Sequence, residues 1–311
     1  MAGKTRFGIF IPQIVPIPRV IEQCRFVEAL GYDSLWIGDQ FYNTLRQNGL
    51  MWEAWTLLAA IAGQTTHIRL GTLVTNFIYR NPALVASQAL TVDHLSYGRL
   101  ELGLGAGFSP QDHPMTGSEA WEPRERIDRF SEAVQIVDQM LRNEVTNFEG
   151  QYYRIKGSVL SPRPIQKPRP PLTLGVSGVR AMKVAAAYAD CWNTLDISLS
   201  EYSTGEHIPA RQALEACRRR QETFDEYCVV LGRNPHNIRR SLLVGYAADA
   251  PTSSLDQIKD YISQYQIIGI SEFIFFWIPD EYQEVFAGRI SGFDQAMVEL
   301  FSKQVIPAWR E

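Results

Sequence analysis

Short apolar runs alternate along the chain with segments whose apolar residues recur every three or four positions. The stretch 68–107 shows this most clearly, with an apolar run over 68–74, a helical pattern from Pro82 to Gly98 and a second apolar run over 100–104. Apolar runs of this length are typical of strands, and the longer spacing is typical of helices. The stretch is therefore predicted to be a strand–helix–strand unit whose two strands are parallel.

The same unit recurs over the rest of the chain. The predicted strands are 7–11, 34–37, 68–74, 100–104, 172–176, 190–193, 239–246 and 272–277. The predicted helices cover about 17–30, 54–61, 82–97, 123–141, 178–189, 211–231, 255–265 and 293–305. Eight strand–helix repeats with near-continuous apolar strands are typical of a (β/α)8 TIM barrel, whose sheet is covered on both faces. We therefore predict an α/β protein with a single barrel domain over residues 1–311 and insertions in its mouth loops.

Several segments interrupt the barrel pattern. Residues 145–156 are predicted to form a small hairpin excursion. The segments 42–52, 108–121 and 198–209 lack periodicity and follow predicted strands. Because loops at the carboxyl ends of barrel strands carry the chemistry in such folds, we expect substrate specificity to lie in these three loops.

Composition and charge exclude several classes of function. The chain is 45% hydrophobic and has a net charge of −4 with no dense basic run, which argues against nucleic acid or an anionic membrane as a partner. It has neither a signal-peptide pattern nor an apolar run long enough to span a bilayer, so a cytoplasmic location is expected. The five histidines lack metal-ligand spacing, and no metal site is predicted. Buried, reduced thiols are expected at Cys24, Cys191, Cys217 and Cys228.

An ordered set of motifs covers roughly the first two thirds of the chain. The motifs are FGIFIPQ (7–13), GYDSLWIGDQF (31–41), EAWTLLAAIA (53–62), RLGTLVTN (69–76), DHLSYGRLELGLGAG (93–107), FEGQYYR (148–154) and ADCWNT (189–194). In these motifs and their order, the sequence resembles the bacterial luciferase-like monooxygenase superfamily, and in particular its F420-dependent oxidoreductases. The resemblance implies a (β/α)8 barrel that uses reduced flavin or the deazaflavin coenzyme F420.

The resemblance also places candidate cofactor-binding residues. Gly175, Ser177 and Gly178 come between a strand and a helix, where backbone N–H groups and the helix dipole favour a phosphate, and the family holds the cofactor's phosphate tail there. In F420-dependent members the third strand ends in a non-proline cis peptide that backs the ring, which predicts such a bond between Thr72 and Leu73 here. The full candidate set is Asp39, Thr72, Leu73, Asn76, Gly105, Gly107, Gly175, Ser177 and Gly178.

Two residues are candidates for a catalytic role. Asp39 matches an aspartate that many F420-dependent relatives place near the ring, but Gln40 stands where several of them have a histidine, and an amide is neither an acid nor a base at neutral pH. His113, in the loop 108–121, is the remaining candidate for proton transfer. Sugar-phosphate-oxidising relatives carry a glutamate where this chain has Phe108, which predicts a more apolar substrate.

Other polar and aromatic residues are predicted to be structural. His94 is expected to be a packed, hydrogen-bonded side chain at a helix end, and Arg69 and Glu101 are expected to pair inside the barrel. The tryptophans near predicted strand ends and mouth loops are candidates for an aromatic substrate pocket, although each one by itself is expected in the core. They are Trp36, Trp52, Trp55, Trp121, Trp192 and Trp277.

The function implied first by the resemblance is hydride exchange between F420 and an organic, apolar substrate. One alternative is a two-component monooxygenase that receives FMNH2 from a separate reductase. Another is a non-catalytic flavin-binding barrel, for which the absence of a histidine at position 40 is mild support. The expected partners are a small-molecule substrate, a flavin or F420 reductase and a second copy of the chain in a homodimer.

Overall fold

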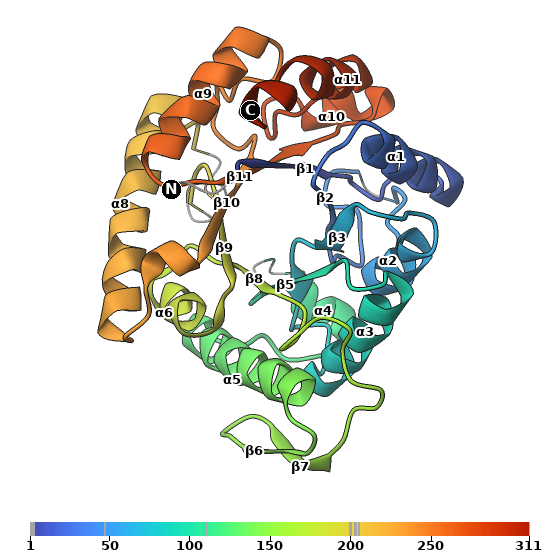
Figure 1. The fold of residues 1–311 in the computed structure, drawn as a ribbon, viewed down its shortest axis with the longest axis vertical. Helices are drawn as coiled ribbons and strands as arrows, with labels where there is room; N and C mark the ends of the chain where they lie inside the picture. The colour runs from blue at the N-terminus through green and yellow to red at the C-terminus, as the bar shows by residue number, and fades with distance from the viewer. Residues whose placement is uncertain are drawn as a thin grey trace.

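Eight parallel strands form a closed ring with helices around it (Figure 1). The computed structural model describes residues 4–46, 48–107, 109, 111–198, 201, 204 and 206–310. The strands of the ring are β1 (Arg6–Phe10), β2 (Ser34–Ile37), β3 (Arg69–Thr72), β5 (Leu100–Gly105), β8 (Leu172–Gly175), β9 (Cys191–Leu195), β10 (Arg239–Val244) and β11 (Glu272–Phe276). Pairing of β3 with β5 and of β1 with β11 closes the ring, which confirms the predicted TIM barrel.

The helices cover the outside of the ring, as predicted. They are α1 (Ile17–Ala29), α2 (Ala54–Ala62), α3 (Pro82–Leu95), α5 (Pro123–Arg142), α6 (Val179–Tyr188), α8 (Ala210–Val230), α9 (Leu255–Ile267), α10 (Gln283–Phe286) and α11 (Gln295–Gln304). Local sequence explains where several of them begin. In α3, Pro82 occupies the first turn and the Asn81 side chain accepts a hydrogen bond from the Ala83 N–H, which satisfies one of the unpaired donors at the helix start.

The predicted hairpin projects from the barrel beyond α5 (Figure 1). Its strands are β6 (Thr146–Glu149) and β7 (Arg154–Ser158). The Glu132 carboxylate on α5 accepts hydrogen bonds from the N–H groups of Gln151, Tyr152 and Tyr153. The turn of the hairpin is therefore fastened to the barrel by backbone contacts, which periodicity alone does not indicate.

Three segments differ from the predicted pattern. The loop 108–121 contains a short helix, α4 (Asp112–Thr116), which is too brief to produce a periodic signal. The third strand ends at Thr72 and the chain continues into a two-residue strand, β4 (Thr75–Asn76), which pairs with β5. The sixth strand of the ring extends to Leu195.

Trp36, on β2, is fully buried beside glycines of the neighbouring strands. A Cβ atom built on Gly71 would lie 2.9 Å from Cζ3 of its indole ring, and one built on Gly8 would lie 3.2 Å from its Nε1 atom. The same Nε1 donates a hydrogen bond of 2.9 Å to Ser34 Oγ. The absence of side chains on these glycines of β1 and β3 therefore leaves the space that the large indole ring fills, which keeps the interior closely packed.

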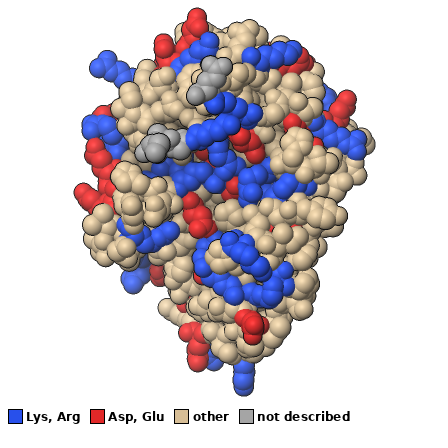
Figure 2. Space-filling view, in the orientation of Figure 1, with Lys and Arg blue, Asp and Glu red and all other residues tan. Residues whose placement is uncertain are grey.

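The surface charge is unevenly distributed. Although the net charge is −4, Figure 2 shows Lys and Arg side chains gathered over the middle of the viewed face. In the part of the chain that the structure describes, no helix has the length and apolar character needed to cross a membrane. The four cysteines are buried and unpaired, as predicted.

Candidate functional site

Val74 fills a groove between two strand-end glycines at the mouth of the barrel. A Cβ built on Gly175 would lie 2.7 Å from Val74 Cγ1, and a Cβ built on Gly105 would overlap Cγ2. The valine reaches across two strands, because β4 pairs with β5 and β5 pairs with β8. Val74 is only half-buried, so an apolar surface remains accessible where the barrel strands end. Gly105 and Gly175 thus seat a side chain that forms a wall of the mouth.

The cis peptide lies one residue later than predicted. It joins Leu73 to Val74, so the prediction of a bond between Thr72 and Leu73 was wrong. The Thr72 hydroxyl donates a hydrogen bond of 3.0 Å to the Gly103 carbonyl and lies 2.7 Å from Thr75 Oγ1, which holds Thr72 within the barrel wall. Sequence reasoning therefore missed Val74 as the residue presented at the mouth. The signal that could have found it is a β-branched residue opposite two glycines on neighbouring strands.

The N-terminus of α6 opens directly after β8. Its N-cap is Gly178, and no side chain caps the helix. Ser177 is half-buried and Gly178 is exposed, and a Cβ built on Gly178 would meet no heavy atom within 4 Å. The N–H groups of a first helical turn have no partner within the helix, and the helix dipole favours an anion beside them. The predicted phosphate segment is thus an accessible, uncapped helix start.

Asp39 is buried after the end of β2 and is paired with Arg80. The Arg80 Nε and Nη2 atoms donate to the two carboxylate oxygens at 2.7 Å each, and the Asn76 N–H donates at 3.0 Å. Arg80 also pairs with Glu53, at the start of α2. Burial raises the pKa of Asp39, and the Arg80 guanidinium opposes that shift. The carboxylate therefore ties the loops that follow β2 and β4 to each other.

Asn76 connects these loops to α4. Its Nδ2 atom donates to Asp112 Oδ2 at 2.8 Å, and its Oδ1 atom accepts from the Ile78 N–H at 3.0 Å. The Tyr79 hydroxyl donates to the other oxygen of Asp112. Gly107 has a φ of +74°, and a Cβ there would lie 2.6 Å from Ile78 Cδ1, so the chain beside Asn76 requires glycine. Asp112 is a buried site residue that the sequence did not single out.

His113, the catalytic candidate, and His94, predicted to be structural, differ in their surroundings. His113 accepts a hydrogen bond of 3.3 Å at Nε2 from the Trp121 N–H, and its Nδ1 lies 3.3 Å from Ser118 Oγ. Burial lowers the pKa of His113, so the neutral ring is favoured, with both nitrogens engaged inside its own loop. His94 Nε2 lies 2.9 Å from the Arg163 carbonyl oxygen, which confirms its predicted structural role.

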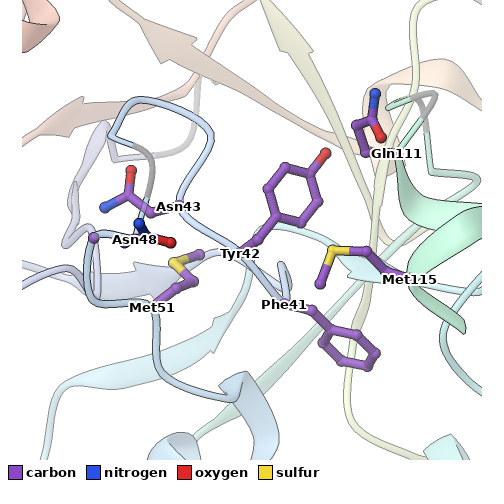
Figure 3. A pocket seen from close by; sticks show the side chains of 8 residues that line it. Phe41, Tyr42, Asn43, Asn48, Met51, Gln111 and Met115 are labelled. Atoms are coloured by element: carbon purple, nitrogen blue, oxygen red, sulfur yellow. The ribbon is translucent and has the colours of Figure 1, made fainter.

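A cavity of about 410 Å³ opens between the loop after β2 and α4 (Figure 3). Its lining residues are Phe41, Tyr42, Asn43, Asn48, Gly49, Met51, Gln111 and Met115. Figure 3 shows Met51 and Asn43 on one side of the Tyr42 ring and Met115 and Gln111 on the other. None of the six tryptophans considered as pocket candidates is among the described residues that line this cavity, so its aromatic surface comes from Phe41 and Tyr42.

The walls of the cavity are tied to the rest of the mouth. The Phe41 ring stacks on Tyr79 with centroids 4.0 Å apart, and the Tyr42 hydroxyl lies 2.5 Å from Ser109 Oγ. Because Tyr79 also contacts Asp112, the cavity wall and the Asn76 network share a residue. Phe108, on which the prediction of an apolar substrate partly depends, lies outside the described residues.

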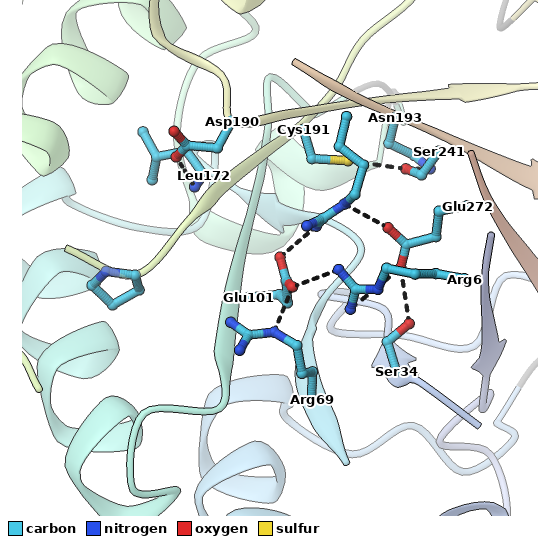
Figure 4. A network of polar contacts seen from close by, with 12 residues as sticks. Arg6, Ser34, Arg69, Glu101, Leu172, Asp190, Cys191, Asn193, Ser241 and Glu272 are labelled. Carbon is cyan, nitrogen blue, oxygen red and sulfur yellow. Dashed lines mark hydrogen bonds and ion pairs between the residues drawn. The ribbon is translucent and has the colours of Figure 1, made fainter. Parts of the chain in front are cut away.

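An ionic cluster closes the opposite end of the barrel (Figure 4). Glu101 contacts Arg69 at 2.6 Å, Arg239 at 2.7 Å and Arg6 at 3.3 Å, and Glu272 contacts Arg239 at 2.9 Å. Burial by itself would raise the pKa of Glu101, but the three guanidinium groups lower it to about 2. The predicted pair of Arg69 and Glu101 is confirmed. Its place at the amino ends of the strands is typical of residues that stabilise a barrel.

The comparison with known families agrees with this barrel and its mouth. The family model of the luciferase-like monooxygenases matches residues 5–269. The chain belongs to this family. The match includes the cis bond before Val74, the glycines beside it and the N-terminus of α6, so every part of the mouth described above lies within the family's shared region.

Curated relatives of this luciferase-like protein include enzymes described as F420-dependent. The chain is 28% identical over 208 residues to an F420-dependent glucose-6-phosphate dehydrogenase of Amycolatopsis mediterranei (strain U-32), covering 66% of this chain and 62% of that relative. It is 31% identical over 175 residues to an F420-dependent hydroxymycolic acid dehydrogenase of Mycobacterium tuberculosis (strain ATCC 25618 / H37Rv), covering 56% of this chain and 48% of the relative. The chain thus spans less than two thirds of the length of these relatives.

Solved structures confirm the fold over the whole chain. An F420-dependent secondary alcohol dehydrogenase in complex with an F420-acetone adduct superposes with a TM-score of 0.75 at 21% identity, covering 99% of this chain and 100% of the other. The monooxygenase RslO1 from Streptomyces bottropensis superposes with a TM-score of 0.74 at 17% identity, covering 98% and 99%. Since both kinds of enzyme share the barrel, the superposition establishes the fold of this luciferase-like protein and leaves its reaction to the site.

Proposed function

We propose that this protein is an F420-dependent oxidoreductase, in which a hydride passes between the deazaflavin and a small organic substrate of apolar character. The observation that carries the proposal is Val74, held by Gly105 and Gly175 as an apolar wall at the barrel mouth. The relatives described as F420-dependent support this choice over FMN.

The residues at the mouth fit a flat ring with a phosphate-bearing tail. Such a ring needs an apolar wall, which the accessible surface of Val74 supplies. The tail needs an anion site, for which the uncapped start of α6 at Ser177 and Gly178 offers backbone N–H groups. These positions follow β3 and β8, which both pair with β5, so one molecule can contact both. The predicted set of cofactor residues is retained, with Val74 added to it.

When bound, F420 would supply the group that accepts or donates the hydride. The protein's own residues would bind and orient it and exclude water. Asp39 and Asn76 would fix the positions of the mouth loops that contact the cofactor, because their polar atoms are hydrogen-bonded to Arg80 and Asp112. We also propose that the protein is a cytoplasmic homodimer and that a separate F420 or flavin reductase is its partner.

A binding titration with a charge variant tests the cofactor assignment. The purified protein is titrated with F420 and with FMN, each oxidised and reduced, and cofactor fluorescence is followed. We expect F420 to bind, and Ser177→Asp to weaken that binding at least about tenfold, because a carboxylate at the start of α6 would repel the cofactor phosphate.

Ser263→Asp is the matched control, since it adds the same charge at an exposed position on α9 and should leave the affinity unchanged. Selective binding of reduced FMN would favour the two-component monooxygenase instead. A cofactor that binds without turnover over a broad panel of substrates would favour a non-catalytic flavin-binding barrel. Failure of every cofactor form to bind would overturn the proposal while leaving the barrel intact.

A further inference from the structure

The described residues that line the cavity beside Tyr42 all have uncharged side chains. Of the described residues that line it, Phe41, Met51 and Met115 are apolar, while Tyr42 and Gln111 carry polar, uncharged groups. Its volume of about 410 Å³ is in the range of small-molecule sites. A ligand here would therefore meet an aromatic and thioether surface together with hydroxyl and amide groups.

The charges around the cavity disfavour an anion. Arg80 is already paired with the carboxylates of Asp39 and Glu53. The Arg46 guanidinium lies 4.9 Å from the centre of the Tyr282 ring, outside the set of lining residues. A phosphate in this cavity would thus lose its hydration without gaining a cation from the lining, which is costly in a partly buried site.

Two polar groups are placed to bind an uncharged oxygen atom. The Tyr42 hydroxyl is 2.5 Å from Ser109 Oγ, and either of the two atoms can be the donor in that contact. When Ser109 donates to it, the Tyr42 hydroxyl keeps its own hydrogen for a ligand. The Gln111 side chain is exposed at the cavity and forms no hydrogen bond within the described part of the chain. Each of these groups can donate a hydrogen bond to a carbonyl or hydroxyl oxygen.

We propose that this cavity is the substrate pocket and that it selects an uncharged organic molecule, with a flat apolar body and one carbonyl or hydroxyl oxygen bound by Tyr42, against phosphorylated molecules. The apolar body lies against Phe41, Met51 and Met115, where an aromatic ring contacts the thioether groups. That the ligand is a substrate rests on the proposed function. The selectivity itself rests on the charge of the lining.

Binding of two matched probes to the cofactor-free protein tests the proposal. Acetophenone and phenyl phosphate share a phenyl ring and differ in the presence of a neutral carbonyl or a phosphate, and saturation-transfer NMR with competition measures their affinities. At this cavity, as measured by competition between the two probes, we expect acetophenone to bind at least about tenfold more tightly than phenyl phosphate. Phenyl phosphate bound at the start of α6 does not displace acetophenone and is therefore not counted. Tyr42→Phe should weaken acetophenone binding roughly two- to tenfold, as expected for the loss of one hydrogen bond.

Two variants at exposed positions locate the binding. Met115→Trp fills the cavity and should weaken acetophenone binding at least about tenfold. Gln111→Arg adds a cation and should strengthen phenyl phosphate binding at least about tenfold, whereas Gln151→Arg, on the exposed hairpin, should not. Displacement of acetophenone by phenyl phosphate with equal or tighter affinity in the unaltered protein, no binding of acetophenone, or acetophenone binding unaffected by Met115→Trp would overturn the proposal.

The same samples separate this proposal from the proposed cofactor. If F420 binds normally but the probes fail as described, the pocket assignment is wrong and the cofactor assignment stands. If the probes bind as expected but neither F420 nor FMN binds, the cavity is a selective site and the oxidoreductase assignment is wrong.

Discussion

Replacing Glu101 with glutamine is expected to lower the free energy of unfolding by about 3–5 kcal/mol, as is typical when one partner of a buried ion pair is removed. Glutamine preserves the volume of the side chain but removes the carboxylate that Arg69 contacts, and it leaves Arg6 and Arg239 to share Glu272 (Figure 4). Chemical denaturation measures the change. The barrel mouth lies at the other end of the strands, so cofactor affinity should change little in the folded protein.

Glu149→Gln is the matched control for this prediction. Glu149 is paired with Arg154 on the hairpin, but its side chain is 80% exposed, so solvent already screens the pair. We expect little change in stability. Equal effects of the two substitutions would contradict the interpretation that burial makes the Glu101 cluster important.

The Glu101 cluster also predicts loss of stability in acid. The pKa of Glu101 is lowered from 4.5 to about 2 in the folded protein, so the folded state binds its proton less readily than the unfolded state. The stabilisation is complete above pH 4.5 and is lost as the pH falls towards 2. Denaturation midpoints of the unaltered protein should fall across this window, and those of Glu101→Gln should fall less steeply. If the midpoints of the two proteins fall equally with pH, the Glu101 cluster is not the cause of the loss of stability in acid.

Gly105→Ala is expected to destabilise the protein by about 1–3 kcal/mol and to weaken F420 binding, because the new methyl group overlaps Val74 Cγ2 and forces the wall of the mouth to move. Denaturation and the cofactor titration measure the two effects. Gly63→Ala is the control, since a Cβ there meets no heavy atom closer than 3.7 Å, its φ of −78° suits alanine, and it lies outside the predicted cofactor residues.

Val74→Ala should relieve the overlap that Gly105→Ala creates. Once Val74→Ala removes both γ-methyl groups, the nearest atom to the methyl group introduced at position 105 is the Cβ of residue 74 at 3.3 Å, a contact that small shifts can absorb. The double variant is thus expected to be more stable than the sum of the two single changes predicts, by about 1 kcal/mol or more. Strict additivity would show that Gly105 does not make room for Val74.

Local patterns in the sequence were sufficient to predict the barrel. Each of the eight strands is an apolar run set off by glycine, proline or a helical periodicity, and such signals act over a few residues, so they can be read without knowing what packs against them. The pair of Arg69 and Glu101 was also predictable, since each residue stands two positions before a glycine in neighbouring strands. The order of the family's motifs then indicated where the mouth lies.

The contacts within the mouth were decided by tertiary structure alone. Val74 fits Gly105 and Gly175, and Asn76 meets Asp112, only because strands far apart in the sequence end side by side. The resemblance placed the cis bond between Thr72 and Leu73, whereas in the structure it joins Leu73 to Val74. Secondary structure is specified largely by residues that are close together along the chain. A site depends instead on side-chain volumes and hydrogen-bond donors that come into contact across strands, and no local sequence pattern specifies those contacts.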